Sequence, residues 1–183
     1  MIEWIRNLDF SVLYAIQDTF RCGFLDFLMP KITLLGNYGI IWILAAGGLL
    51  CMKKHRRYGV MLLMGVAVGF LIGNVILKHA VARPRPCWLD TTVQLLIDVP
   101  SDYSFPSGHT MASVIGATIL TGADRRFAPV AIPLAVLISL SRLYLFVHFP
   151  TDVLASVVIG LAIGLSVLYG GRRWMRKHET HAT

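Results

Sequence analysis

Hydrophobic residues are concentrated in five stretches that contain no Asp, Glu, Lys or Arg. Each stretch is long enough, or nearly so, to cross a hydrocarbon core of about 30 Å as a helix. The fourth stretch reaches full length only if it continues through Arg142 to Val147. The pattern predicts an all-α, polytopic membrane helical bundle with five spanning helices: Ile32–Met52, Tyr58–Leu77, Tyr103–Ala123, Phe127–Ser141 and Val153–Gly171.

The first 30 residues have a different pattern, because acidic and basic residues interrupt any apolar run. Apolar residues recur near helical spacing at Ile5, Leu8, Val12, Ile16 and Phe20, with charged residues between them. This spacing is typical of an amphipathic helix lying in the membrane interface. A short soluble helix folded over the bundle is the alternative. We expect residues 1–183 to form a single integral-membrane domain.

The composition supports the membrane class, and the positions of the charged residues explain the positive net charge. The hydrophobic fraction is 56% and the formal net charge is +7. Ten of the seventeen Lys and Arg lie at 53–57, 125–126 and 172–177, and eight of the ten acidic residues lie on the opposite side of the expected topology. The positive-inside rule makes the basic side cytoplasmic, in a multi-pass protein of the cell (plasma) membrane. The charge therefore indicates topology, and a nucleic-acid partner is not needed.

Small residues and cysteines add two structural expectations. Gly65, Gly69 and Gly73 recur at four-residue intervals, which favours close packing of helix backbones in lipid over a ligand-binding role. Cys22 and Cys87 are both expected outside the membrane, where a disulfide between them is possible although their spacing does not require it.

The segment Pro106-Ser107-Gly108-His109 opens the third apolar stretch. Serine is a favoured N-cap, and the glycine after it leaves backbone N–H groups uncovered at a helix N-terminus, which attracts anions. His109 would then lie in the first helical turn, where it can transfer a proton to a bound anion. A capped transmembrane helix with an incidental histidine explains the same four residues when they are considered alone.

Ionisable residues from other stretches fall at the same external depth as this segment. They are Lys78, Arg85, Arg142, His148 and Asp152. A charge within an apolar membrane stretch is costly, which makes Arg142 in particular a candidate site residue. Three cations against one carboxylate favour a multiply charged oxyanion such as phosphate.

The rival interpretation is a metal site built from His109, His148 and Asp152. A divalent ion about 6 Å from each cation would be repelled by roughly 5 kcal/mol per cation at an effective dielectric of 20. We therefore expect no metal and no cofactor.

The two histidines fit a two-step phosphoryl transfer. His148 and Asp152 are four residues apart, so the carboxylate could accept the Nδ1 proton and leave Nε2 as a basic nucleophile for phosphorus. His109 would protonate the leaving oxygen and then take a proton from the attacking water. The transferred phosphoryl group would be stabilised by Lys78, Arg85, Arg142, the Ser107 hydroxyl and the Gly108 N–H.

Together these segments resemble the three signature motifs of the type 2 phosphatidic acid phosphatase superfamily. The motifs are Lys78-x6-Arg85-Pro86, Pro106-Ser107-Gly108-His109 and Ser141-Arg142-x5-His148-x3-Asp152, which span residues 78–152. The resemblance implies a six-helix-type core and metal-independent phosphatase activity, with His148 as nucleophile and His109 as acid. It also places Lys78, Arg85, Ser107, Gly108 and Arg142 on the phosphate. Many membrane members have six spans, whereas five are expected here.

A site at headgroup depth predicts a lipid phosphate substrate, and the resemblance favours undecaprenyl diphosphate, hydrolysed to the monophosphate. Phosphatidylglycerol phosphate, phosphatidate and a lipid phosphotransferase reaction remain alternatives, as does an anion transporter among non-enzymes. We expect the N-terminal segment and Trp88–Val99 to select the lipid, with 93–99 as a candidate lid or wall of its site. The oligomeric state is not predicted.

Overall fold

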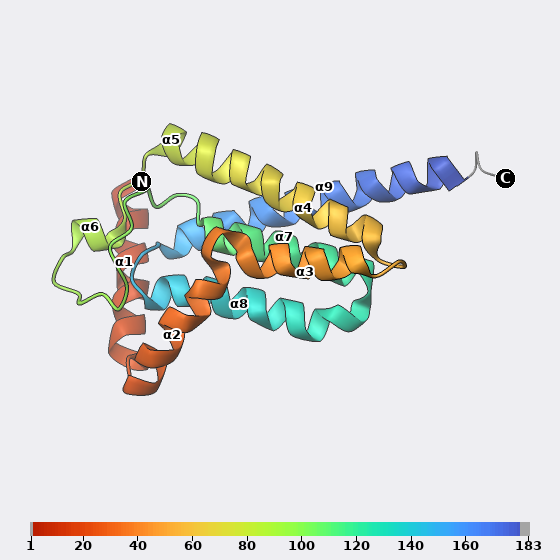
Figure 1. The fold of residues 1–183 in the computed structure, drawn as a ribbon. Helices are drawn as coiled ribbons and strands as arrows, with labels where there is room; N and C mark the ends of the chain where they lie inside the picture. Colours follow the sequence, from red (N-terminus) through yellow and green to blue (C-terminus); the bar gives the residue numbers. More distant parts are fainter. Residues whose placement is uncertain (1, 180–183) are drawn as a thin grey trace.

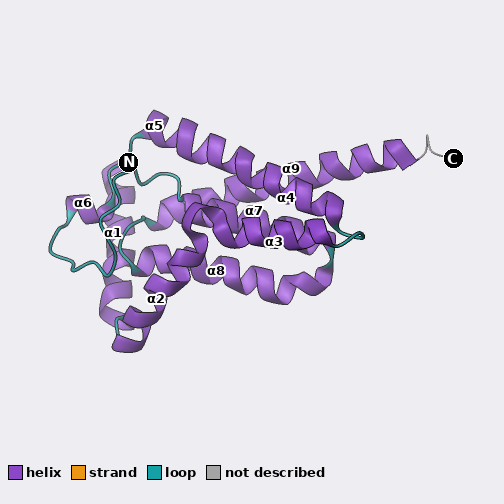
Figure 2. Cartoon of the chain, viewed as in Figure 1, coloured by secondary structure: helices purple, strands orange, loops and turns teal. Residues whose placement is uncertain are grey.

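A computed structural model describes residues 2–179 of the chain, and every regular element in that range is a helix (Figure 2). Loops gather at the two ends of a helical bundle. The elements are α1 (Ile2–Phe20), α2 (Gly23–Gly36), η1 (Asn37–Gly39), α3 (Ile40–Cys51), α4 (Arg56–Phe70), η2 (Leu71–Leu77), α5 (Lys78–Val81), α6 (Pro86–Leu89), α7 (Gly108–Ala123), η3 (Arg125–Phe127), α8 (Ala128–Tyr144) and α9 (Pro150–Glu179).

Helix α7 forms the centre of the bundle and packs against α4, α8 and α9 (Figure 1). Its core partners include Trp42 from α3 and Ile138 from α8. A Cβ at Gly65 or Gly69 would come within 2.8 Å or 2.5 Å of Ile115 on α7. The close approach of α4 to α7 therefore requires these glycines, as the four-residue spacing predicts.

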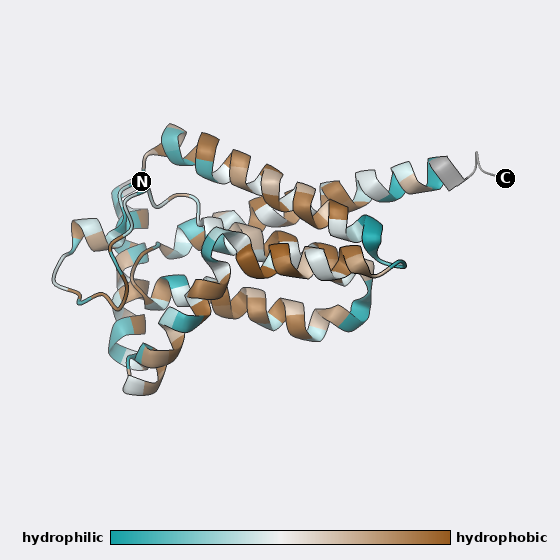
Figure 3. Cartoon of the chain, in the orientation of Figure 1, coloured by the Kyte–Doolittle hydropathy of each residue, from teal (hydrophilic) through white to brown (hydrophobic). Residues whose placement is uncertain are grey.

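Four helical segments among residues 2–179 are long and apolar enough to cross a membrane: Gly23–Cys51, Arg56–Leu89, Arg125–Tyr144 and Pro150–Lys177. Hydrophobic residues run along the length of the bundle, and hydrophilic residues gather towards its ends (Figure 3). The expected third span, Tyr103–Ala123, differs from the structure because its first five residues are loop. Helix α7 begins only at Gly108 and has 16 residues.

The N-terminal region is divided differently from the expectation for residues 1–30. Helix α1 ends at Phe20 and crosses the end of the bundle at which α8 ends and α9 begins (Figure 1). Residues from Gly23 onward belong to α2 and thus to the first candidate span. That span is broken where Tyr38 and Gly39 both have left-handed backbone angles, with φ of 51° and 69°.

The two cysteines that were expected outside the membrane are not bonded to each other. Cys22 lies exposed between α1 and α2, whereas Cys87 is buried in α6, and both carry free thiols. The disulfide that was considered from the sequence is therefore absent from this structure.

Candidate active site

Three cationic side chains from different elements are buried at the end of the bundle near α1. Lys78 begins α5, Arg85 precedes Pro86 at the start of α6, and Arg142 lies in the last turn of α8. Their exposed fractions are 5%, 2% and 4%. Burial of three cations at one place is costly, so the arrangement indicates a binding site for an anion.

Asp102 neutralises two of these cations. Its carboxylate accepts hydrogen bonds from Lys78 and from Arg85 Nη2, the latter at 2.6 Å. Burial disfavours the charged carboxylate, but the hydrogen bond from Lys78 and the charges of Arg85 and Lys78 outweigh it and lower the pKa of Asp102 to about 2. Asp102 is therefore ionised at any physiological pH, and it occupies donors that an incoming phosphate would need.

Arg142 has no comparable hydrogen-bonded carboxylate partner for its positive charge among the described residues. Its Nη1 donates to Thr33 Oγ1 at 2.5 Å, and its buried Nε has no hydrogen-bond partner among the described residues. No carboxylate forms an ion pair with it in the described part of the chain. A buried guanidinium with unused donors is therefore available to bind an anion.

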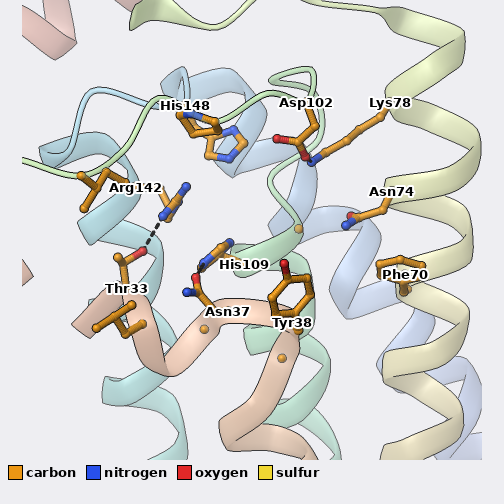
Figure 4. A pocket seen from close by; sticks show the side chains of 18 of the residues that line it. Thr33, Asn37, Tyr38, Phe70, Asn74, Lys78, Asp102, His109, Arg142 and His148 are labelled. Carbon is orange, nitrogen blue, oxygen red and sulfur yellow. Dashed lines mark hydrogen bonds and ion pairs between the residues drawn. The ribbon is translucent and has the colours of Figure 1, made fainter. Parts of the chain in front are cut away.

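The first turn of α7 carries His109 into the same space (Figure 4). Ser107 caps the helix as expected, because its hydroxyl accepts the backbone N–H of Thr110 at 3.4 Å. His109 Nε2 donates to the Asn37 side-chain oxygen at 2.9 Å. This bond to η1 fixes the orientation of the imidazole and leaves Nδ1 as its other hydrogen-bonding nitrogen.

The turn between α8 and α9 holds His148, which is 1% exposed. Arg85 Nη1 lies 3.2 Å from His148 Nε2, so Nε2 carries the lone pair and the proton resides on Nδ1. Burial and the charges of Arg85 and Arg142 hold the pKa of His148 well below its usual value. The imidazole is thus neutral near pH 7, as a nucleophile requires.

Asp152 differs in one respect from the sequence expectation of a direct bond to Nδ1. Its Oδ2 lies 3.8 Å from His148 Nδ1, which is too long for a hydrogen bond. The reason is that Oδ2 already accepts the Ser104 hydroxyl at 2.5 Å and the Phe149 N–H at 2.9 Å. Ser104 Oγ itself lies 3.4 Å from Nδ1, so this hydroxyl connects the imidazole to the carboxylate.

A cavity of about 1290 Å³ joins these groups (Figure 4). Its wall contains most of the expected site residues, together with the segment 95–102 and an apolar strip from α2, α3 and α4. Asp152 and Ser107 are not among the residues of the described wall. The expected site residues in the wall are Lys78, Arg85, Gly108, His109, Arg142 and His148.

Four polar residues of the site were not identified from the sequence: Thr33, Asn37, Asp102 and Ser104. Thr33 and Asn37 lie far from the motifs along the chain, and neutral side chains in an apolar stretch give no charge signal. Asp102 and Ser104 lie within five residues of Ser107, so their proximity to the motif was the available signal.

The described residues contain no group of three or more His, Cys, Asp or Glu that could hold a metal ion. The two histidines and Asp152 face separate partners, and cations surround them. This geometry supports the binding of a phosphate and the transfer of its phosphoryl group, with one imidazole as nucleophile and the other as acid and base.

Comparison with known proteins agrees with that geometry. A family model described as the PAP2 superfamily matches residues 56–176. An undecaprenyl-diphosphatase of Sulfolobus acidocaldarius is 33% identical over 159 residues, covering 85% of this chain and 75% of that protein. A decaprenylphosphoryl-5-phosphoribose phosphatase of Mycobacterium tuberculosis is 33% identical over 182 residues, covering 97% and 99%.

Among solved structures, a transmembrane PAP2-type phosphatidylglycerolphosphate phosphatase from Bacillus subtilis superposes with a TM-score of 0.75. It is 27% identical, and the match covers 92% of this chain and 87% of that one. The expected family is therefore confirmed, and the chain is a multi-helix membrane protein that belongs to the PAP2 superfamily of lipid phosphatases.

Proposed function

We propose that the protein is a metal-independent phosphatase that hydrolyses a polyprenyl diphosphate, such as undecaprenyl diphosphate, to the monophosphate. The observation that carries the proposal is a single cavity in which buried Lys78, Arg85 and Arg142 face two imidazoles at one end and apolar helix surfaces continue from them. The cations suit the terminal phosphate, and the apolar surfaces suit the first isoprene units of the tail.

The reaction proceeds in two displacements. His148 Nε2 attacks the terminal phosphorus and the bond to the bridging oxygen breaks. Protonated His109, whose Nε2–H stays on Asn37, donates its Nδ1 proton to the departing lipid phosphate. Water then attacks phosphorus, its proton passes to His109, and the phosphorus–nitrogen bond breaks to release inorganic phosphate. Ser104 and Asp152 support the positive charge that develops on His148, while the Gly108 N–H and the Ser107 hydroxyl add to phosphate stabilisation.

The cations must exchange partners during this cycle. Arg85 donates to His148 Nε2 and to Asp102 before phosphate binds, and both bonds compete with the substrate. A phosphate with two or more negative charges attracts the guanidinium and ammonium groups more strongly than one carboxylate does. Substrate binding therefore displaces Asp102 and frees the Nε2 lone pair for attack.

The membrane placement that fits this chemistry has five spanning helices in one domain of residues 1–183. Helix α7, with 16 residues, is then a further span, the third in chain order, and α4, α8 and α9 enclose it. Helix α1 lies in the interface, and the basic turns at the opposite end of the bundle are cytoplasmic. The active site then opens at the external face of the cell membrane.

A second candidate substrate is a phosphate monoester on a polyprenyl-phosphoryl pentose. The full-length similarity to decaprenylphosphoryl-5-phosphoribose phosphatase, including the α1 region, favours it. Phosphatidylglycerol phosphate, phosphatidate and transfer to another lipid headgroup use the same catalytic groups. An anion transporter does not explain the hydrogen-bonded chain of His148, Ser104 and Asp152.

The test is phosphate release by purified protein in EDTA, from undecaprenyl diphosphate, decaprenylphosphoryl-5-phosphoribose, phosphatidylglycerol phosphate and phosphatidate in parallel. We expect the highest kcat/KM on the diphosphate. His148→Ala should reduce turnover by roughly a thousandfold or more, whereas exposed His79→Ala should not. Turnover retained in His148→Ala would refute the proposed phosphohistidine intermediate on His148. A higher kcat/KM on a different lipid would refute the proposed preference for a polyprenyl diphosphate.

A further inference from the structure

A chain of ion pairs connects α1 to the carboxylate behind His148. Arg83 Nη2 donates to Asp9 Oδ2 at 2.7 Å, and Arg83 Nη1 donates to Asp152 Oδ1 at 2.5 Å. Asp9 also accepts the Thr151 N–H at 3.0 Å and the Thr151 hydroxyl at 2.6 Å. One guanidinium is therefore shared between two carboxylates that are 143 positions apart in the sequence (Asp9 and Asp152).

Asp9 is held firmly in this chain. Its side chain is 2% exposed, and both of its oxygens accept hydrogen bonds. Beside it, Phe10 packs edge-on against Phe149 with ring centroids 5.2 Å apart, and Leu13 is fully buried. The guanidinium of Arg83 lies 4.0 Å above the same Phe149 ring. Helix α1 is therefore docked on the turn that carries His148.

The charges in this chain explain why a second carboxylate is needed. Arg83 by itself would cancel the charge of Asp152 and leave His148 beside a neutral pair. Asp9 restores a net charge of −1 to the group formed by Asp9, Arg83 and Asp152. That net charge stabilises the positive imidazole that forms when His148 bonds to phosphorus. The three cations of the cavity destabilise the same positive imidazole by repulsion.

We propose that Asp9 is a positioning residue for catalysis, which acts through Arg83 on Asp152, and that α1 thereby forms part of the active site. Asp9 does not line the cavity and contacts no expected substrate group. It also lies outside residues 56–176, which match the family. The inference depends on the proposed role of His148 as nucleophile.

The titration of His148 reports on this effect, and several charged groups face His148 from the elements packed around it. Burial and the charges of Arg85, Arg142 and Lys78 disfavour its protonation, and the charge of Asp102 favours it. The groups that face it are Lys78 from α5, Arg83 and Arg85 from the connection before α6, Asp102 from the loop before α7, His109 from α7, Arg142 from α8 and Asp152 from α9. Asp9 from α1 reaches His148 only through Arg83 and Asp152.

The first test compares Asp9→Asn with Asp18→Asn, which makes the same change at an exposed position of α1. We expect kcat to fall about 10- to 100-fold in Asp9→Asn, with KM within about threefold of the wild type. Loss of negative charge disfavours protonated His148, so the acid limb of kcat/KM should move to lower pH by about half to one unit. Asp18→Asn should leave both unchanged.

The second test separates charge from structure. In Asp9→Asn, Arg83 cancels Asp152, so a further Arg83→Gln substitution should return the net charge beside His148 to −1. We expect the acid limb of the double variant to move back towards the wild-type position. Asp9→Glu, which keeps the charge, should retain most of the activity. A purely structural role for Asp9 predicts that the double variant is worse than the single one.

The outcomes are distinguishable from failure of the proposed function. If the wild type releases phosphate but Asp9→Asn matches it in kcat and in pH profile, the role of Asp9 is refuted and the phosphatase mechanism is not. If Asp9→Asn does not fold, Asp9→Glu and the double variant decide: loss of most activity in Asp9→Glu, or an acid limb of the double variant that stays about half a unit or more below the wild-type position, overturns the proposal. Absence of wild-type activity on all four lipids refutes the proposed function itself.

Discussion

Arg142 is expected to reduce the stability of the protein while it serves phosphate binding, and its replacement by methionine tests this. The guanidinium is 4% exposed, its Nη1 donates to Thr33, and its Nε is unpaired among the described residues. Replacing a buried ionic group by an apolar one of similar volume is often stabilising by about 1–4 kcal/mol. Loss of the Thr33 hydrogen bond offsets about 1 kcal/mol of this. We therefore expect a net gain of up to about 3 kcal/mol.

The assay is thermal unfolding of purified protein in detergent, with orthovanadate as an anion that mimics the transferring phosphoryl group. For a chain of this size each kcal/mol raises Tm by about 2–4 °C, so we expect a rise of up to about 12 °C. Vanadate at 100 times its Kd should stabilise the wild type by about 2.7 kcal/mol and should have little effect on Arg142→Met. The variant should also lose turnover, since stability and function oppose each other at such a site.

Arg83→Met is the matched control, because Arg83 is also a partly enclosed guanidinium but is paired with two carboxylates. Its removal leaves Asp9 and Asp152 buried without their cation, so we expect a loss of about 2–4 kcal/mol. A Tm of Arg142→Met below that of the wild type in the absence of vanadate would refute the reasoning. Equal destabilisation by both substitutions would refute it as well.

Four further predictions follow from the site and the packing. Asn37→Ala should lower kcat about 10-fold or more with little change in KM, because His109 loses the hydrogen bond that orients it. Changes of equal size in kcat and KM would contradict this prediction. Asp102→Asn should strengthen vanadate inhibition about fivefold, because vanadate no longer has to displace a half-exposed carboxylate whose interaction with two cations contributes about 1 kcal/mol. Weaker inhibition of the variant by vanadate would contradict this prediction. Because the folded pKa of His148 is depressed, kcat/KM should stay level as the pH falls through 6.5, and a decline centred there would contradict it. Gly69→Leu should destabilise the bundle by about 1–3 kcal/mol in chemical unfolding, whereas substitution of Gly47, which has open space, should not.

The motif residues illustrate how far spacing alone can predict a site. Lys78, Arg85, His109, Arg142 and His148 were expected at one membrane depth because each lies at or near the external end of an apolar stretch. The structure brings all five to one cavity. Depth follows from counting residues along spans, so it can be derived without knowing which helices are neighbours.

The helix limits were predicted less well. The third apolar stretch was expected to begin at Tyr103, but α7 starts at Gly108, because Ser107 has extended backbone angles and caps the helix there. Residues 23–30 were expected in the interfacial segment and instead begin α2. Asp26 and Lys31 concealed this span, because charged residues near a helix end are tolerated when their side chains reach the surface.

Apolar periodicity, charge placement and motif spacing determined the all-helical membrane class, the family and the depth of the catalytic groups, because each depends on distance along one chain. Only the tertiary structure decided which groups meet across the chain: Thr33 with Arg142, Asn37 with His109, and Asp9 with Arg83. These pairs join elements whose adjacency is set by how α1 and α2 dock on α7, α8 and α9. That docking depends on side-chain shape and burial in three dimensions, which no one-dimensional pattern records.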